Sequence, residues 1–341
     1  MMDDTRVHER TGRPAREPPR PHSLAVPGRE RPLDLPVFFP SVSSVKSDVP
    51  VPDVIALHQV LRSAAYLLSA YDFVRARPEE REIIRRVLDE ARISGVTILL
   101  DSGRYEAHWH RDQTWDHEAY AGALHDLPVP LAFMLDGPAV EDSAADLAQE
   151  IRDRVLRDQA VAGDALILPI THGTPDQLPE LVSLVGEHLS PAVIAVPERE
   201  LGAGIVERAA TLWRIRNALS NSSPASAIHL LGTGNPISIL VYAIAGADSF
   251  DGLEWCQTVV DPVSAHLHHL QHFDFVAHLG AFGQTEGPFR ARAYAHNLAF
   301  MASWMERVRN DLADRDHPLL TDVIGPVARQ RLTARVPEVF A

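Results

Sequence analysis

The sequence predicts an α/β fold, a (β/α)8 TIM barrel, and three observations support this. Short apolar runs of strand length alternate with helical patterns between Pro36 and Asp251. Polar residues recur where these runs end, as they do at the carboxyl ends of barrel strands. The 341 residues, 45% of them hydrophobic, suffice for one barrel of about 250 residues with extensions. The alternative, an open doubly wound sheet, requires a Gly-x-Gly-x-x-Gly turn near the first strand, which this sequence lacks.

We expect three regions along the chain. Residues 1–34 are rich in proline and arginine with little to bury, so they predict a disordered tail. The barrel domain should cover 35–310, and 311–341 should form a C-terminal helical extension.

Within the barrel domain, eight strands are expected, at 36–40, 65–69, 96–100, 131–135, 165–170, 192–196, 227–231 and 247–250. The helices are expected at 53–63, 78–92, 142–160, 203–219 and 237–245. Residues 109–120 should form an irregular loop, whose aromatic side chains either pack locally or stack on unpaired bases.

The stretch 229–252 combines the clearest local signals. Gly232 lets the chain turn tightly after an apolar strand, and Asn235 followed by Pro236 predicts a helix start. A second strand then ends at Asp251. This βαβ unit places a carboxylate at the end of the barrel where active sites lie, although Asp251 could also merely cap a strand.

This stretch resembles the signature of the tRNA-guanine transglycosylase family, in which a Gly-x-Gly turn precedes a helix and a Phe-Asp pair closes the unit. The resemblance extends over about residues 35–310. It implies a barrel that exchanges guanine for a 7-deazaguanine base within a polynucleotide. It also implies that Asp251 is the catalytic nucleophile.

The segment Asp101-Ser-Gly-Arg-Tyr105 resembles the family's Asp-Ser-Gly-Gly-aromatic sequence. The resemblance makes Asp101 the second catalytic aspartate and Tyr105 an aromatic that stacks on the base. Arg104 departs from the pattern, because it stands where the family has glycine. Either the substrate differs there, or Arg104 points away toward a phosphate.

Further positions correspond to base-binding residues of the family. Asp136 would read the guanine edge, and His172 replaces the usual glutamine, which leaves the identity of the base open. Glu198 lies in a charged turn where the family has a glycine-rich one. The residues implied to bind the substrate are Ser102, Tyr105, Asp136, His172, Gly173, Glu198, Leu231 and Gly232.

The family's zinc subdomain has no counterpart here, since Cys256 is the only cysteine. His296 matches the family's histidine ligand. A replacement metal site among the histidines between His266 and His278 is conceivable, with pairs such as His268 and His272 sharing a helix face, but a metal-free run of surface histidines is the better interpretation. We therefore expect no metal, and the sequence carries no signature of an organic cofactor.

The net charge of −14 argues against a protein that coats nucleic acids nonspecifically. An acidic enzyme could still bind a polynucleotide through a local basic rim. The sequence shows neither a membrane-spanning run nor a signal peptide, so we expect a cytoplasmic protein. A homodimer or partner modification proteins fit the family.

The expected function is base exchange in a nucleic acid, with guanine replaced by a 7-deazaguanine resembling preQ0. DNA is favoured over tRNA because the missing zinc module resembles the DNA-acting branch of the family. One alternative is a transglycosylase or N-glycoside hydrolase that acts on a free nucleoside or nucleotide. Another is a non-catalytic subunit of a modification complex, which the retention of Asp101, Asp136 and Asp251 disfavours.

Overall fold

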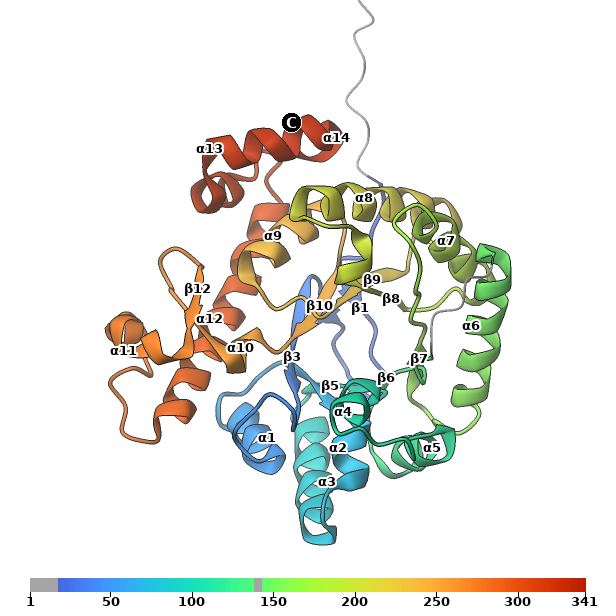
Figure 1. The fold of residues 1–341 in the computed structure, drawn as a ribbon, viewed down its shortest axis with the longest axis vertical. Helices are drawn as coiled ribbons and strands as arrows, with labels where there is room; N and C mark the ends of the chain where they lie inside the picture. The colour runs from blue at the N-terminus through green and yellow to red at the C-terminus, as the bar shows by residue number, and fades with distance from the viewer. Residues whose placement is uncertain (1–17, 138–142) are drawn as a thin grey trace, which may run out of the picture.

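The computed structural model describes residues 18–137 and 143–341. Eight parallel strands form a nearly closed sheet ringed by helices, which confirms the predicted (β/α)8 barrel (Figure 1). Around the sheet the strands are β7 (Leu166–Leu168), β6 (Leu131–Phe133), β5 (Thr97–Asp101), β4 (Ala65–Ser69), β3 (Val37–Val42), β10 (Ser249–Gly252), β9 (Ala227–Leu231) and β8 (Val193–Pro197). An isolated bridge between Ile170 and Ala195 joins the two ends of this order.

The strands are buried on both faces because the barrel interior is filled with side chains and helices cover the outside. The surrounding helices are α1 (Val51–Val60), α2 (Ala70–Arg75), α3 (Pro78–Ile93), α4 (Arg104–Trp109), α5 (His117–Asp126), α6 (Ala144–Gln159), α7 (Leu178–Leu189), α8 (Ile205–Ser222) and α9 (Pro236–Ala245). In α3, the buried stripe of Ile84, Val87, Leu88 and Ala91 has the spacing of one helix face.

The predicted βαβ unit forms as expected. The side chain of Asn235 accepts hydrogen bonds from the backbone N–H groups of Ile237 and Ser238, so it caps α9. Gly246 ends the helix at a φ of 117°, a conformation that favours glycine. The following strand, β10, carries Asp251 to the end of the barrel.

The expected disorder of residues 1–34 is wrong for residues 18–34, and residues 1–17 lie outside the described part of the chain. The short strands β1 (Ser23–Leu24) and β2 (Leu33–Asp34) pair antiparallel. Leu24 and Leu33 are buried, and Arg29 donates a hydrogen bond to Thr97 at the start of β5. This hairpin therefore covers the amino-terminal end of the barrel, and tertiary burial stabilises a segment whose composition suggested a tail.

The loop expected at 109–120 is wrong at its two ends, whereas residues 110–116 between the helices form neither helix nor strand. Trp109 is the last residue of α4, and α5 begins at His117 after Asp116, whose side chain accepts a hydrogen bond from the N–H of Ala119. Tyr120 is fully buried and donates a hydrogen bond to the carbonyl of Phe133 in β6. The polar residues between the helices hid these two short helices in the sequence.

A C-terminal region packs beside the barrel (Figure 1). It comprises α10 (Glu254–Gln257), β11 (Thr258–Val260), β12 (Leu267–His269), α11 (Phe273–Val276), α12 (Phe289–Leu312), α13 (Pro318–Arg335) and α14 (Pro337–Phe340), and 3₁₀ turns lie at Glu198–Leu201, Leu270–His272 and Ala277–Leu279. Trp304 of α12 is fully buried and donates a hydrogen bond to the carbonyl of Pro236, which anchors the region to α9. Helix α12 crosses the boundary expected at residue 310. Among the described helices, none is long and apolar enough to span a membrane.

Candidate active site

A cavity of about 740 Å³ opens at the carboxyl ends of the barrel strands. The predicted site residues that line it are Asp101, Ser102, Tyr105, Asp136, His172, Glu198, Leu231, Gly232 and Asp251. Gly173 does not line it; its N–H donates a hydrogen bond to Oε2 of Glu200 at 3.0 Å instead. Strands distant in sequence thus bring nearly all the predicted residues to one place.

Asp251 is held by three hydrogen-bond donors. Its Oδ2 accepts from the hydroxyl of Ser41 at 2.9 Å, and its Oδ1 accepts from the N–H of Gly232 at 3.0 Å. Nε2 of His229 lies 3.1 Å from the same Oδ1. These donors stabilise a negative charge on the carboxylate and fix its orientation at the cavity wall.

His229 supports Asp251 from inside the barrel. It is buried between strands, with its ring edge-on to Phe133, and its Nδ1 lies 2.9 Å from the hydroxyl of Ser249. A proton on Nε2 is needed for the bond to Asp251, so Nδ1 accepts from Ser249. This arrangement resembles the way an orienting partner fixes a catalytic group in other enzymes.

Asp101 lies in a different environment from Asp251. Burial, together with the nearby charges of Glu106, Asp251 and Asp136, raises the pKa of Asp101 to about 8, although the N–H of Gly103 donates to it at 2.8 Å. A carboxyl group with this pKa holds a proton near neutral pH and can donate it. The two predicted catalytic carboxylates therefore suit opposite roles, one as nucleophile and one as acid.

Two more acids lie behind Asp101. Glu106 of α4 is buried and accepts hydrogen bonds from the hydroxyls of Ser43, at 2.6 Å, and Ser69, at 2.8 Å. Burial and the charge of Asp72 raise the pKa of Glu106 to about 7. Burial, opposed by hydrogen bonds from Ser44, raises the pKa of Asp72 to about 6. The acids at and behind the cavity wall thus favour a protonated Asp101.

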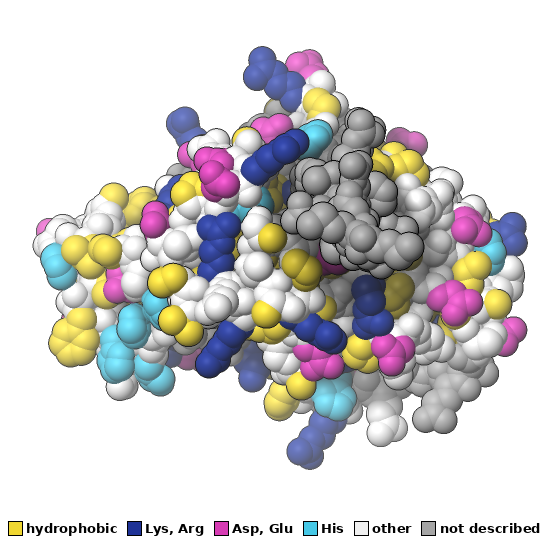
Figure 2. Space-filling view, turned by 90° about the horizontal axis from the view of Figure 1, so that it is seen from above, with side chains coloured by type: hydrophobic (Ala, Val, Ile, Leu, Met, Phe, Trp, Pro, Cys, Tyr) yellow, Lys and Arg dark blue, Asp and Glu magenta, His cyan; other side chains and the backbone are white. Residues whose placement is uncertain are grey.

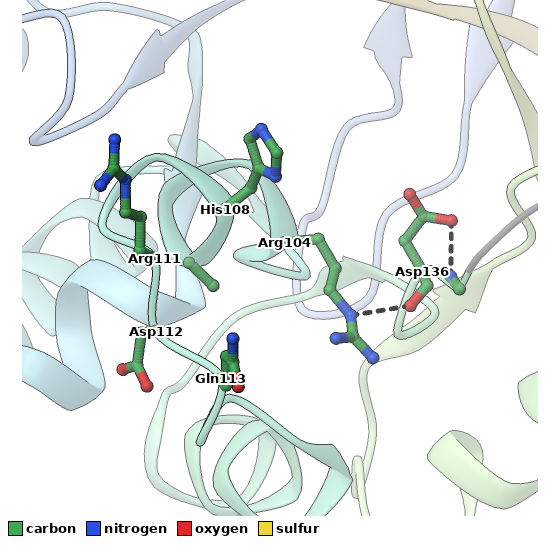
Figure 3. A pocket seen from close by; sticks show the side chains of 8 residues that line it. Arg104, His108, Arg111, Asp112, Gln113 and Asp136 are labelled. Atoms are coloured by element: carbon green, nitrogen blue, oxygen red, sulfur yellow. Dashed lines mark hydrogen bonds between the residues drawn. The ribbon is translucent and has the colours of Figure 1, made fainter.

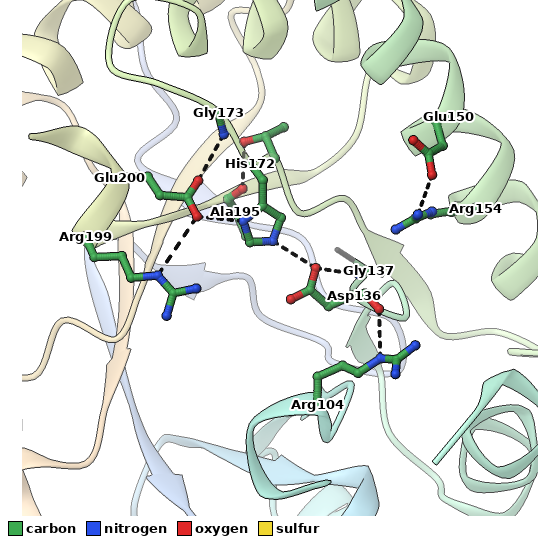
Figure 4. Close-up of polar contacts among 11 residues, drawn as sticks. Arg104, Asp136, Gly137, Glu150, Arg154, His172, Gly173, Ala195, Arg199 and Glu200 are labelled. Carbon is green, nitrogen blue, oxygen red and sulfur yellow. Dashed lines mark hydrogen bonds and ion pairs between the residues drawn. The ribbon is translucent and has the colours of Figure 1, made fainter. Parts of the chain in front are cut away.

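His172 lies between two carboxylates and contacts both (Figure 4). Its Nε2 lies 2.9 Å from Oδ1 of Asp136, and its Nδ1 lies 2.8 Å from Oε1 of Glu200. Burial alone would lower the pKa of His172, but the hydrogen bonds and charges of Asp136 and Glu200 outweigh it and raise the pKa to about 9. His172 is therefore a charged imidazolium with both of its N–H groups engaged.

Glu198 does not reach freely into the cavity. Its Oε1 accepts hydrogen bonds from Arg208, at 2.7 Å, and from the hydroxyl of Tyr242, at 2.8 Å. Because Oε1 already accepts two hydrogen bonds, it has little capacity left to accept one from a substrate, the contact that the sequence predicts for Glu198.

Arg104, which stood out in the sequence as a substrate difference or a phosphate contact, bonds to backbone carbonyls of this chain. Its Nε donates to the backbone carbonyl of Asp136 at 3.0 Å (Figure 3). Its Nη1 lies 3.4 Å from the backbone carbonyl of Trp115. The side chain thus links α4 to the end of β6 and leaves the carboxylate of Asp136 facing the cavity side. Within residues 18–137 and 143–341, no carboxylate forms an ion pair with Arg104.

The sequence did not reveal Ser41, Glu106, Glu200 or His229 as site residues. Glu106 follows Tyr105 directly in the Asp101 motif, which is a usable signal. His229 stands two residues before Leu231 on the same strand, so the period of two also points it inward. Ser41 and Glu200 carry no local signal, because their partners come from distant strands.

The histidine-rich segment does not form the helix face considered from the sequence. His268 and His269 lie on β12, and successive strand residues point to opposite faces. Figure 2 shows a group of histidines beside hydrophobic side chains at one edge of the molecule. In the described part of the chain, no group of three or more histidine, cysteine or acidic residues is arranged to hold a metal ion. His296 is buried, with Nε2 2.9 Å from the carbonyl of Val260.

The fold and the site together define a (β/α)8-barrel protein with a carboxylate-rich cavity at the end of the barrel where barrel enzymes hold their active sites. No protein-family model and no curated protein matches this sequence.

Proposed function

We propose that this protein is a base-exchange glycosyltransferase that replaces guanine in a nucleic acid by a 7-deazaguanine base. The observation that carries the proposal is the contrast between two carboxylates in one cavity. Asp251 is stabilised as a carboxylate by three donors, whereas Asp101 is placed to hold a proton. Displacement at an anomeric carbon requires this combination of nucleophile and acid.

In the first step, Asp251 attacks C1′ of the target nucleotide and the bond from C1′ to N9 of guanine breaks. Oδ2 is the better nucleophile, since it accepts one hydrogen bond while Oδ1 has two donor neighbours. The proton of Asp101 passes to the departing guanine, which leaves a covalent ester between Asp251 and the sugar.

In the second step, N9 of the incoming base attacks C1′ and the ester bond to Asp251 breaks. The N9 proton of that base passes to Asp101, which restores the starting protonation state. The exchange is thus balanced in protons and consumes no oxidant or reductant. The target base has to leave any duplex stack before it can enter the cavity.

Recognition of the base is assigned to Asp136, Tyr105 and Leu231, all of which line the cavity. The carboxylate of Asp136 can accept from the N–H groups of a guanine edge, while His172 holds its Oδ1 in place. The side chains of Tyr105 and Leu231 provide surfaces on which a flat base can stack.

The proposal is tested by incubating the purified protein with radiolabelled guanine and, separately, single-stranded DNA, duplex DNA, bulk tRNA and guanosine. Label retained by a polymer, and absent with Asp251→Ala, supports base exchange and names the substrate. If no substrate retains label while circular dichroism shows a folded protein, the proposal fails.

A second candidate is exchange or hydrolysis at a free nucleoside or nucleotide. The observation that favours it is the number of acids around the cavity, which include Glu198 and Glu254 beside the three aspartates, in a chain of net charge −14. Such surroundings repel the sugar-phosphate backbone of a nucleic acid unless cations at the rim of the cavity attract it. Label retained by guanosine alone, or guanine released without label uptake, would favour this candidate.

A further inference from the structure

Trp109, the last residue of α4, is unusual among the tryptophans. All five tryptophans lie in the described part of the chain, and Trp109 is 54% exposed while the others are buried or half-buried. It lies one helical turn after Tyr105, itself 40% exposed and part of the cavity wall. The two ring centroids are 6.2 Å apart at an interplanar angle of 63°. A strip of aromatic surface therefore runs from the cavity to the outside.

Lys46 lies over this strip. Its Nζ is 4.6 Å from the centre of the Trp109 ring, within the range of a cation–π contact. Over the described ranges, no carboxylate pairs with Lys46. The lysine follows Ser41 at the end of β3 and the next serines, Ser43 and Ser44; these three hydroxyls donate to Asp251, Glu106 and Asp72. The segment that binds the proposed nucleophile Asp251 thus also places a cation beside the exposed indole.

We propose that Trp109 and Lys46 bind the nucleotide adjacent to the exchanged base in a single-stranded nucleic acid. This inference rests on the proposed function, since it assigns the cavity to the target base. The neighbouring base stacks on the indole, and Lys46 exchanges its contact with the ring for one with a phosphate. Aromatic surfaces beside cations are the usual platform for unpaired bases, because every base presents a π-face.

The charge distribution favours a polymer over a free nucleoside at this place. The cavity wall carries Asp101, Asp136 and Asp251, so phosphates are best held outside it. The Lys46 ammonium lies outside the cavity lining, at the end of the aromatic strip. A free nucleoside whose base fills the cavity has no second base to place on Trp109. Single-stranded DNA and RNA share the required chemistry, and the experiment separates them.

The first test uses tryptophan fluorescence of the full chain without an incoming base. The titrants are an oligothymidylate of about 12 nucleotides with one central guanine, its RNA equivalent, and deoxyguanosine. We expect quenching by one or both oligonucleotides but little by deoxyguanosine, and loss of this quenching in Trp109→Phe. Trp109→Ala should weaken oligonucleotide binding about tenfold or more, measured by anisotropy of a labelled strand. Lys46→Gln should weaken binding and reduce its salt dependence.

A matched control is Phe275→Ala, since Phe275 is 75% exposed on α11, away from the cavity lining. This variant should bind the oligonucleotide as the unchanged protein does. Quenching that persists in Trp109→Phe, or wild-type affinity in a folded Trp109→Ala, overturns the inference.

The failure of this inference can be told from failure of the proposed function. With exchange measured on both substrates, Trp109→Ala should lower kcat/KM about tenfold for the oligonucleotide and leave that for deoxyguanosine unchanged. If Trp109→Ala and the unchanged protein exchange the oligonucleotide equally well, the proposed role of Trp109 is overturned while base exchange stands. Trp109-dependent binding without any exchange supports the platform and refutes the proposed reaction.

Discussion

The hydroxyl of Ser41 donates a hydrogen bond to Oδ2 of Asp251 at 2.9 Å, and this contact joins the first and the last strand of the barrel. The two residues are 210 positions apart in the chain. Because β3 pairs directly with β10, the closure of the sheet itself brings the serine to the carboxylate. The geometry of the proposed nucleophile therefore depends on the barrel being formed.

Asp251→Asn should abolish label exchange, since an amide cannot form the ester. Ser41→Ala should lower kcat by about 10-fold to 100-fold, the effect of one lost hydrogen bond to a charged group. Steady-state exchange kinetics measure both. Full activity of Asp251→Asn in a preparation free of other transglycosylases contradicts the assignment of the nucleophile.

Glu106→Gln should move the alkaline limb of the pH–rate profile to lower pH. The charge of Glu106 contributes to the raised pKa of Asp101, so its removal lowers that pKa and Asp101 loses its proton earlier. The exposed Glu118 on α5 offers a matched control, as Glu118→Gln should leave the profile in place. An unmoved alkaline limb in Glu106→Gln means that Glu106 does not tune Asp101.

The charged His172 should make stability fall at alkaline pH. Its pKa is about 9 in the folded protein against 6.5 for the free side chain, so its contribution is complete below about pH 6.5 and is lost as pH rises through 9. Urea unfolding at pH 6.5 and 9.5 should show a decrease larger by about 2–3 kcal/mol in the unchanged protein than in His172→Gln. Equal decreases in the two proteins would show that His172 is not held as an imidazolium.

Arg216 and Asp248 form an ion pair with both side chains fully buried. Arg216→Met should lower the free energy of unfolding by about 3–5 kcal/mol, because it leaves the Asp248 carboxylate buried with too few partners. Arg214→Met on the same helix is the control; its pair with the exposed Asp176 should contribute no more than about 1 kcal/mol. Similar losses for both variants would argue against the burial-based account.

The sequence was sufficient for the barrel because its signals are local. Apolar runs at 65–69 and 227–231 and the cap at Asn235 report on their own segments, and the acids Asp101 and Asp251 stand at the carboxyl ends of strands. The N-terminal hairpin could not be predicted, since its few apolar residues are buried by the far end of the barrel. Ser41 and Glu200 become partners of Asp251 and His172 only because of which strands lie side by side, and no local sequence pattern encodes that neighbourhood.

The bridge between Ile170 and Ala195 is the narrowest connection of the sheet, and the ion pair of His172 with Glu200 spans the same junction just beyond it. His172, which we propose positions Asp136 for a base, therefore also helps to hold the two ends of the sheet together. A ligand that accepts a hydrogen bond from His172 competes with the hydrogen bonds of His172 that keep the two ends of the sheet together. We therefore expect the proposed recognition of a base and the closure of the barrel to be thermodynamically linked through the imidazole ring of His172.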